Sequence, residues 1–464
     1  MKLYELTNCA QGKGAVLCIA MAMTQFIPFN LAQAETTASI FEEVIVVTGT
    51  LGKTPDNLIQ PATESLIAPD SAALVERLPG AALINNGTIS GQVQYRGLFG
   101  SRVSTKINNQ SFHSGGPNLM DPPMSYAPAT LIESITVNRG ISPVTFGPSL
   151  SGGVNADLKD INYAPTSDYA SHYDLTAIGR SADESYAAGG IVGVSNENFK
   201  LSGLFSIEDG DDQRFHGGDI ANTFHHRQVY GLTGGYKTDL SELTLSARRH
   251  ETDPTGNAPF AMDIKLIDTN FFTANYLRSI GDVLLKLDFG YTDVYHEMNN
   301  YAFRGAPAAI MRYRETQASA NTNSAAVSLL FDVADASVEV GVDHNDADMD
   351  VTISNPRNTS FFINSLPNIN VSRTGLYVNV QDVVTSWHYS LGARLDSHDS
   401  SSGDASYGSA FPGMAQNLAN LYNATNRKWD DETVDLVAQF WKKQESLTWR
   451  FSLARKNRAP GFLE

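Results

Sequence analysis

From about residue 165 onward, apolar and polar residues alternate along much of the chain. In the segment 285–291, the odd-numbered positions are Leu, Leu, Phe and Tyr, and the even-numbered ones are Lys, Asp and Gly. The same alternation recurs over residues 433–440 and 447–453. Successive side chains of a strand point to opposite faces, so this period of two predicts β-strands with one apolar face. The alternation alone fits a soluble sandwich and a membrane barrel equally well.

The connections between these segments separate the two architectures. Short links alternate with long polar loops, which is typical of a membrane barrel with short turns at one end and long loops at the other. This pattern predicts about thirteen strands. The short links are expected at 195–198, 237–242, 278–282, 332–336, 383–387 and 442–445, and the long loops at 208–226, 251–261, 293–313, 344–372 and 396–431.

Residues 51–162 have a different pattern, which predicts a compact α/β domain. A helical turn or two is expected over 71–78, ended by Pro79-Gly80. Short strands separated by glycines are expected at 93–96, 103–107, 131–137 and 154–158.

The N-terminus is typical of a secretory signal peptide. Lys2 and Lys13 precede an apolar stretch over 14–29, and Ala32-Gln33-Ala34 is a cleavage site of the A-x-A type. Cleavage there removes the chain's 2 cysteines, Cys9 and Cys18. The mature protein is therefore expected to have no disulfide, no thiolate nucleophile and no cysteine-based metal site.

Composition agrees with a membrane barrel. The 33 Lys+Arg against 50 Asp+Glu give a net charge of -17, which argues against nucleic acid as a partner. Only 18% of residues are charged, yet the mature part has no apolar run long enough for a spanning helix. A barrel reconciles the low charged fraction with the absence of a long apolar run, because the apolar residues of its strands alternate with polar ones.

Several motifs resemble the TonB-dependent outer-membrane receptor family when they are taken in order. Glu43 to Thr48 is similar to the segment that binds TonB, although its β-branched residues would also suit an ordinary first strand. The segments 75–80, 94–97, 107–109, 132–140, 146–147 and 152–155 are similar to plug-domain motifs. The residues carried over are Arg96, Gly97, Arg139, Gly140, Gly147 and Gly153 for the plug motifs, and Glu43, Val44, Ile45, Val46, Val47 and Thr48 for TonB binding.

The resemblance implies a transmembrane antiparallel β-barrel with an N-terminal α/β plug domain inside its lumen. The expected organisation is a signal peptide (1–34), a TonB box and linker (35–50), the plug (51–162) and a partial barrel (163–464). Family barrels have 22 strands, so about thirteen strands ending at Glu464 predict a truncated chain.

The function that the resemblance implies is active uptake of a scarce ligand, such as a metal ion or a siderophore chelate, across the bacterial outer membrane. The expected partners are the periplasmic domain of TonB, the lipid bilayer and an external small ligand. No cofactor and no enzymatic activity are expected, because the sequence contains no catalytic constellation or phosphate loop. A passive adhesion or phage-receptor barrel and a non-functional remnant of a transporter are the alternatives.

One plug segment bears on the ligand. The pattern from Gly115 to Tyr126 is similar to the copper-receptor branch of the family, which has a cysteine four positions before the methionine, where this chain has Gly116. His113, Met120 and Met124 could still offer soft donors. The alternative is that the methionines pack in the plug and Asp-Pro-Pro shapes a rigid loop. The candidate ligand-binding residues are His113, Met120, Asp121, Met124 and Tyr126.

Further histidines are expected in the outer loops, either as ligands or as solvated side chains. None has the spacing of a zinc or calcium motif. They are His216, His225, His226, His296 beside Glu297 and Met298, and His344 beside Asp346, Asp348 and Asp350.

Overall fold

The computed structural model describes residues 58–61, 68–116, 119–150, 152–444 and 447–461. The predicted signal peptide and the predicted TonB-binding segment therefore lie outside the described residues. Within these ranges, the model contains no helix that is both long enough and apolar enough to cross a membrane.

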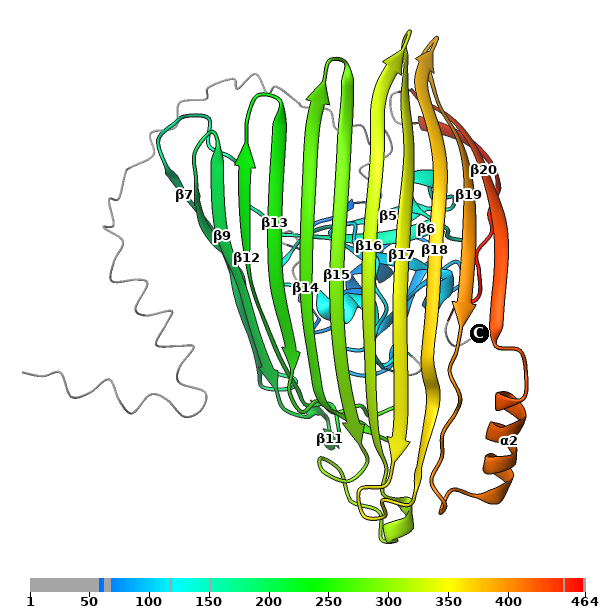
Figure 1. Cartoon of the computed structure of the whole chain (residues 1–464). Coiled ribbons are helices and arrows are strands. Elements are labelled where there is room, and N and C mark those ends of the chain that lie inside the picture. The colour runs from blue at the N-terminus through cyan, green and yellow to red at the C-terminus, as the bar shows by residue number, and fades with distance from the viewer. Residues whose placement is uncertain (1–57, 62–67, 117–118, 151, 445–446, 462–464) are drawn as a thin grey trace, which may run out of the picture. The chain divides into compact units, whose positions relative to one another are not determined.

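A single antiparallel sheet of 13 strands accounts for most of the chain (Figure 1). Each strand pairs with its neighbour in the sequence, except that β9 pairs with β12 across a small hairpin. The predicted strand number is confirmed. The strands are β7 (Ala170–Arg180), β8 (Ser185–Ser195), β9 (Phe199–Gly210), β12 (His225–Lys237), β13 (Ser241–Thr252), β14 (Asp263–Ile280), β15 (Val283–Asn299), β16 (Glu315–Val333), β17 (Ala336–Ser354), β18 (Phe362–Val384), β19 (Trp387–Ser401), β20 (Lys428–Gln444) and β21 (Leu447–Arg455).

The short links lie where they were predicted, for example at 281–282 and 334–335. The long loops are shorter than predicted, because the strands continue into polar sequence. The loop expected over 344–372 spans only 355–361, and the loop expected over 293–313 spans 300–314. Polar residues on both faces of a strand end have no alternating apolar pattern, so periodicity could not detect these extensions. Three loops carry structure of their own: β10 (Gln213–Phe215) with β11 (Gly218–Ile220) in one, a 3-10 turn over Ile310–Arg312 in another, and the helix α2 (Gly413–Asn423) in the third.

The plug segment folds into two small sheets connected by 3-10 turns. β1 (Leu58–Ile59), β5 (Ile132–Arg139), β6 (Gly152–Leu158) and β4 (Ser104–Ile107) form one sheet, in which only β4 and β6 are parallel. β2 (Ala81–Ile84) and β3 (Gln92–Tyr95) form the other. The predicted helical turn after residue 70 is η3 (Ser71–Arg77), and Asp70 caps it by accepting from the Ala72 N–H. Other turns are η4 (Gly100–Arg102), η6 (Pro123–Tyr126), η7 (Val144–Phe146) and η8 (Ile310–Arg312), the last outside the plug.

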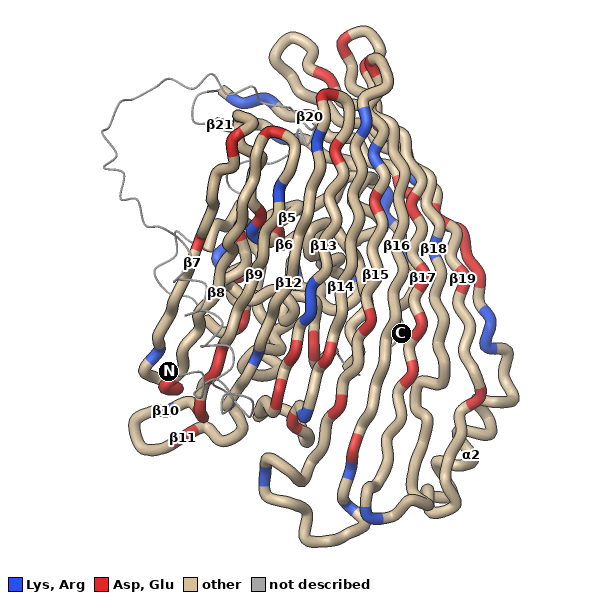
Figure 2. Tube along the Cα trace, turned by 60° about the vertical axis from the view of Figure 1, so that its left-hand side comes forward, with Lys and Arg blue, Asp and Glu red and all other residues tan. Residues whose placement is uncertain are grey.

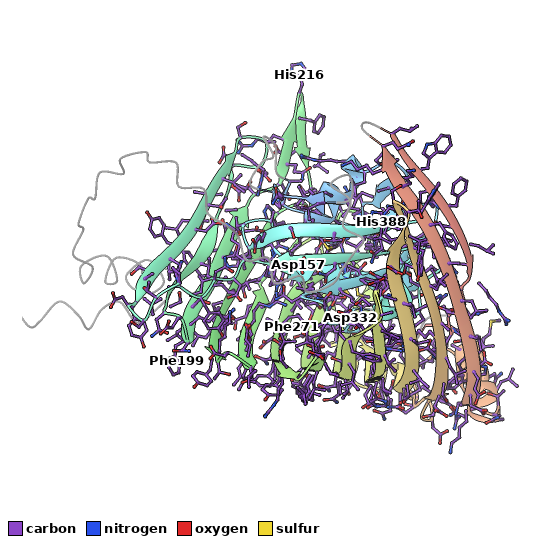
Figure 3. All side chains as sticks on the ribbon, turned by 90° about the horizontal axis from the view of Figure 1, so that it is seen from above. Asp157, Phe199, His216, Phe271, Asp332 and His388 are labelled. Carbon is purple, nitrogen blue, oxygen red and sulfur yellow. The ribbon has the colours of Figure 1, made fainter. Side chains whose placement is uncertain are left out.

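The large sheet curves around the plug, which lies on its concave side (Figure 3). Plug residues such as Leu131, Ile135 and Val154 share one buried apolar cluster with Phe271 and Val294 of the sheet. In β15, the even-numbered positions from Gly290 to Met298 are buried, whereas aromatic side chains at odd positions reach the outer face. The inner face thus packs on the plug, and the outer face carries the exposed apolar belt expected of a membrane barrel.

Two of the predicted plug motifs meet in space. Arg96 and Gly97 adopt positive φ values of 50° and 79° after β3, and the Arg96 N–H donates to Gly80 O at 2.7 Å. A Cβ added at Gly140 would lie 3.4 Å from Arg96 Nη1. Gly147 also has a positive φ, and a Cβ at Gly153 would collide with the Phe146 ring. Glycine is therefore required at these positions for steric reasons.

Candidate functional site

The plug segment that contains the predicted ligand residues lies against the inner face of β12 to β16. The His113 N–H donates to Thr322 Oγ1 at 3.2 Å, and Phe112 contacts the Phe271 ring edge-on at 5.1 Å. The pKa of His113 is lowered to about 4 by burial, so its imidazole is neutral at physiological pH. His296, which also lies on this inner face, is close to the end of β15 from which the long loop 300–314 leaves the sheet.

Asp121 organises the segment. It is completely buried, and it accepts hydrogen bonds from Gly115 N at 3.0 Å and from Gly116 N at 2.7 Å. Tyr126 Oη donates to the other side of the same carboxylate, at Oδ2. Burial and the neighbouring Asp121 raise the pKa of Tyr126 well above its usual value, so the phenol remains a donor. The Asp121 carboxylate thus ties Gly115 and Gly116 to Tyr126.

His296 of β15 faces this carboxylate. Its Nδ1 lies 3.5 Å from Asp121 Oδ1, and both side chains are 0% exposed. That distance is too long for a well-formed hydrogen bond, and neither ring nitrogen has a hydrogen-bond partner in the structure. A buried imidazole without a partner is costly and calls for an explanation such as a ligand.

Two buried methionines lie close in the sequence to His296 and Asp121. Met298 is two residues further along β15, so its side chain leaves the same face, and it is 2% exposed. Met120 precedes Asp121 in the plug and is 4% exposed. A Cβ added at Gly116 would lie 2.6 Å from His296 Nδ1, so only glycine allows the plug to approach the strand this closely.

Of the predicted set, the structure places Asp121 against the phenol of Tyr126 and near His296 of β15. Met124 and Tyr126 also belong to the buried apolar cluster, and Met120 is buried. The prediction that His296 and Met298 lie in an outer loop was wrong, because β15 extends to Asn299. Their alternate spacing on a strand was the only sequence signal that they share a face.

The other predicted histidines do not lie together in one site. His225 and His226 begin β12 rather than lying in a loop, and His226 pairs with Asp209 on the outer side. His216 is at the projecting tip of the β10–β11 hairpin (Figure 3). The predicted acidic loop after His344 is part of β17, where Asp346 and Asp348 accept from Asn370. Among the described residues, no group of three or more His, Cys, Asp or Glu side chains is arranged to hold a metal ion.

Two arginines of the sheet hold the plug next to this site. Arg227 Nη1 donates to Ser125 O at 2.7 Å, and Arg227 Nη2 donates to Pro69 O at 3.0 Å. Arg248 Nη1 donates to Tyr126 O at 2.6 Å while its guanidinium lies over the Phe271 ring. Both arginines thus bind carbonyls at the end of η6, where backbone acceptors lack helical partners.

A second contact of the same kind lies across the plug. Arg394 Nη1 donates to Val144 O at 3.2 Å, at the start of η7. Its charge is balanced by Asp343 and Asp396, which also bind Arg373. Acidic residues are frequent along the strands (Figure 2), and Arg227 and Arg394 are each paired with acidic residues of the sheet. The plug itself contributes only neutral carbonyls to these contacts.

Comparison with known proteins defines the class. Residues 62–154 match the family model of the TonB-dependent Receptor Plug Domain. The fold is similar to that of the copper transporter OprC, with 18% identity, a TM-score of 0.77, and 88% of this chain and 65% of that chain covered. It is also similar to the ferric citrate transporter FecA (14%, 0.61, 86% and 61%) and to the hemophore receptor HasR of Serratia marcescens (14%, 0.65, 88% and 64%). No curated protein sequence matches the chain.

The sheet and the plug together form a plugged antiparallel sheet with the fold of these proteins. The chain carries the plug domain of the TonB-dependent receptors and has their fold, which confirms the resemblance predicted from the sequence. The chain spans slightly less than two thirds of the length of OprC, at 65%.

Proposed function

We propose that this protein takes part in TonB-dependent uptake of a metal ion, or of a small metal complex, across the bacterial outer membrane. The long-loop end of the sheet is the outer end, as in other membrane barrels. The cargo binds between β15 and the plug residues 115–116 and 120–121. Met120, Asp121, His296 and Met298 are the residues that would meet it.

The observation that carries the proposal is the state of His296. It is fully buried and has no hydrogen-bond partner, and it faces a glycine rather than a packing side chain. Imidazole and thioether donors together suit copper and related ions. The copper transporter OprC, a similar fold, supports a metal as the cargo.

The arginine contacts suit a plug that must move. Arg227 is paired with Glu208, so withdrawing the plug breaks the hydrogen bonds of Arg227 to neutral carbonyls and leaves its charge paired. Tyr126 links the proposed cargo site to the arginine contacts, because its phenol donates to Asp121 and its carbonyl accepts from Arg248. Binding of cargo and retention of the plug are therefore linked through one short segment.

Deletion of residues 42–48 tests the transport part of the proposal. Cells producing the deletion variant should bind the metal as well as cells producing the unmodified protein, but should accumulate none of it. Equal accumulation in both strains would overturn TonB-dependent uptake. An unmodified protein that binds neither copper nor any other metal ion would overturn the choice of cargo.

A further inference from the structure

We infer that residues 160–167, which join the plug to β7, form an anchor that stays bound to the sheet when the plug moves, so that the plug pivots about Lys159. The inference rests on the proposed function, in which the plug must move, and adds a fixed point to that movement. The anchor follows β6, which ends at Leu158, and it contacts the sheet at the end with the short links, where β8 turns into β9 and where β12 ends.

Lys159 marks the boundary between the plug and the anchor. Its N–H donates to Leu131 O of the plug at 2.8 Å, and its Nζ donates to Asp174 Oδ1 of β7 at 2.7 Å. The same ammonium donates to Thr176 Oγ1 at 3.1 Å. Lys159 is therefore bound to the plug through its backbone and to the sheet through its side chain.

The backbone of the anchor is hydrogen-bonded to the turn between β8 and β9. The Ala164 N–H donates to Asn196 O at 3.1 Å, and the Glu197 N–H donates to Thr166 O at 2.8 Å. Hydrogen bonds run in both directions between the anchor and the turn, so each segment satisfies backbone groups of the other. The anchor is thus attached to a part of the sheet that does not depend on the plug for its own strand pairing.

Lys200 of β9 holds the anchor by its charge. Its Nζ lies 2.6 Å from Asp160 Oδ2, and its side chain is 8% exposed. The same ammonium is 5.2 Å from the centroid of the Tyr163 ring, and that of Lys237, the last residue of β12, is 5.6 Å from it. A Cβ added at Gly235 would lie 2.5 Å from Tyr163 Oη, so the tyrosine lies directly on β12. The negative face of an aromatic ring attracts cations, so Tyr163 binds to two strands at once.

The contacts of the plug body are of a different kind. Arg227 and Arg394 donate to plug carbonyls and remain paired with acidic residues of the sheet when those bonds break. Removal of the anchor would instead separate Asp160 from the nearly buried Lys200 and leave a cation without its partner. The contacts of the plug body are therefore expected to break before those of the anchor.

Hydrogen exchange of the purified chain in detergent micelles, measured at increasing urea concentration, tests the anchor without any cargo. The amides of Ala164 and Glu197 report on the anchor, and those of β5 and β6 report on the plug. The plug amides should lose their protection at urea concentrations at which the two anchor amides and those of β8 and β9 still keep theirs. Loss of protection at Ala164 and Glu197 together with the plug would overturn the inference.

Lys200→Met should speed exchange at Ala164 and Glu197 by about tenfold or more and change that of the β5 and β6 amides by less than about twofold. Lys265→Met is the matched control, because it removes a lysine that is also 2.6 Å from a carboxylate but lies on β14. If Lys200→Met does not fold, Lys237→Met, which removes the second ammonium from Tyr163, takes its place. Equal exchange at the anchor amides in the lysine variant and the control would overturn the anchor.

Two engineered disulfides connect the anchor to transport. Thr166→Cys with Glu197→Cys ties the anchor to the turn, and Val144→Cys with Gly392→Cys ties the plug body to β19, where a Cβ at Gly392 would lie 2.7 Å from Val144 Cγ2. Cells with the first disulfide should accumulate copper as unmodified cells do, and cells with the second should accumulate none until it is reduced. Loss of accumulation with both would overturn the anchor. No accumulation in unmodified cells would instead overturn the proposed function, and hydrogen exchange would then decide on the anchor alone.

Discussion

Arg227 and Glu208 form an ion pair on the inner face of the sheet, with Nε 3.0 Å from Oε2 and side chains that are 1% and 3% exposed. The pair lies on adjacent strands, β12 and β9, where the two residues are directly opposite each other. Arg227 uses its remaining N–H groups on plug carbonyls. The sheet therefore supplies both the cation that holds the plug and the anion that neutralises it.

Glu208→Gln should destabilise the folded protein by about 3–5 kcal/mol, because it leaves the Arg227 charge buried and unpaired. Chemical unfolding in detergent measures the loss. Glu251→Gln is a matched control, since Glu251 pairs with Arg249 on the accessible outer face and should cost less than about 1 kcal/mol. Equal losses in the two variants would contradict the assigned role of the Arg227–Glu208 pair.

Arg248→Met should loosen the plug near η6. The substitution removes a charged hydrogen bond to Tyr126 O, which is worth about 1.5–3 kcal/mol. Hydrogen exchange over residues 119–131 should become faster in this variant. Arg249→Met, which alters the neighbouring residue on the opposite face, should leave exchange in the plug unchanged. Identical exchange in both variants would show that Arg248 does not retain the plug.

Gly140→Ala should destabilise the plug by about 1–2 kcal/mol, because Gly140 has a φ of +88° and lies on the Arg96 guanidinium. Gly179→Ala is the control. That glycine lies in β7 with no atom within 4 Å of an added Cβ, and its replacement should change stability by less than about 0.5 kcal/mol. Hydrogen exchange of the β5 and β6 amides is the measurement. Similar effects of the two substitutions would contradict the requirement for glycine at position 140.

Asp70 gives the plug a defined pH dependence. Burial raises its pKa from 3.8 to about 6, so the folded plug binds this proton more tightly than the unfolded chain does. The contribution of Asp70 is therefore most favourable below pH 3.8 and declines as pH rises to about 6. The loss is about 3 kcal/mol at most, from a shift of about 2 pKa units.

Comparison of unmodified protein with Asp70→Asn isolates this contribution from the other titrating groups. The difference in plug stability between the two should change between pH 4 and pH 6 and be constant from pH 6 to pH 8. Hydrogen exchange at the η3 amides, corrected for its intrinsic pH dependence, provides the readout. A difference that is independent of pH would show that Asp70 does not titrate in this range.

Periodicity and turn chemistry were sufficient to predict the sheet. The positions of the short links, such as 281–282, followed from turn residues between two alternating segments. The plug glycines were predicted because their motifs are local, and the structure shows positive φ or close contact at Gly97, Gly140, Gly147 and Gly153.

The pairing of plug and sheet could not be predicted in the same way. Asp121 and His296 are 175 positions apart (296 − 121), and only the folded sheet brings them together. His296 and Met298 lie where polar residues occur on both faces of β15, so the end of the strand appeared to be a loop. The arginines that hold the plug bind backbone carbonyls, which have no sequence pattern at all.

X-ray absorption spectroscopy of the copper-loaded protein tests the central claim, a metal site between plug and strand, most directly. We expect a first shell with nitrogen or oxygen donors at about 2.0 Å and sulfur at about 2.3 Å or slightly longer. The sulfur contribution should fall in Met120→Leu and Met298→Leu, and the imidazole contribution should disappear in His296→Phe. A shell of light donors only, unchanged in all three variants, would mean that copper binds elsewhere and would contradict the account.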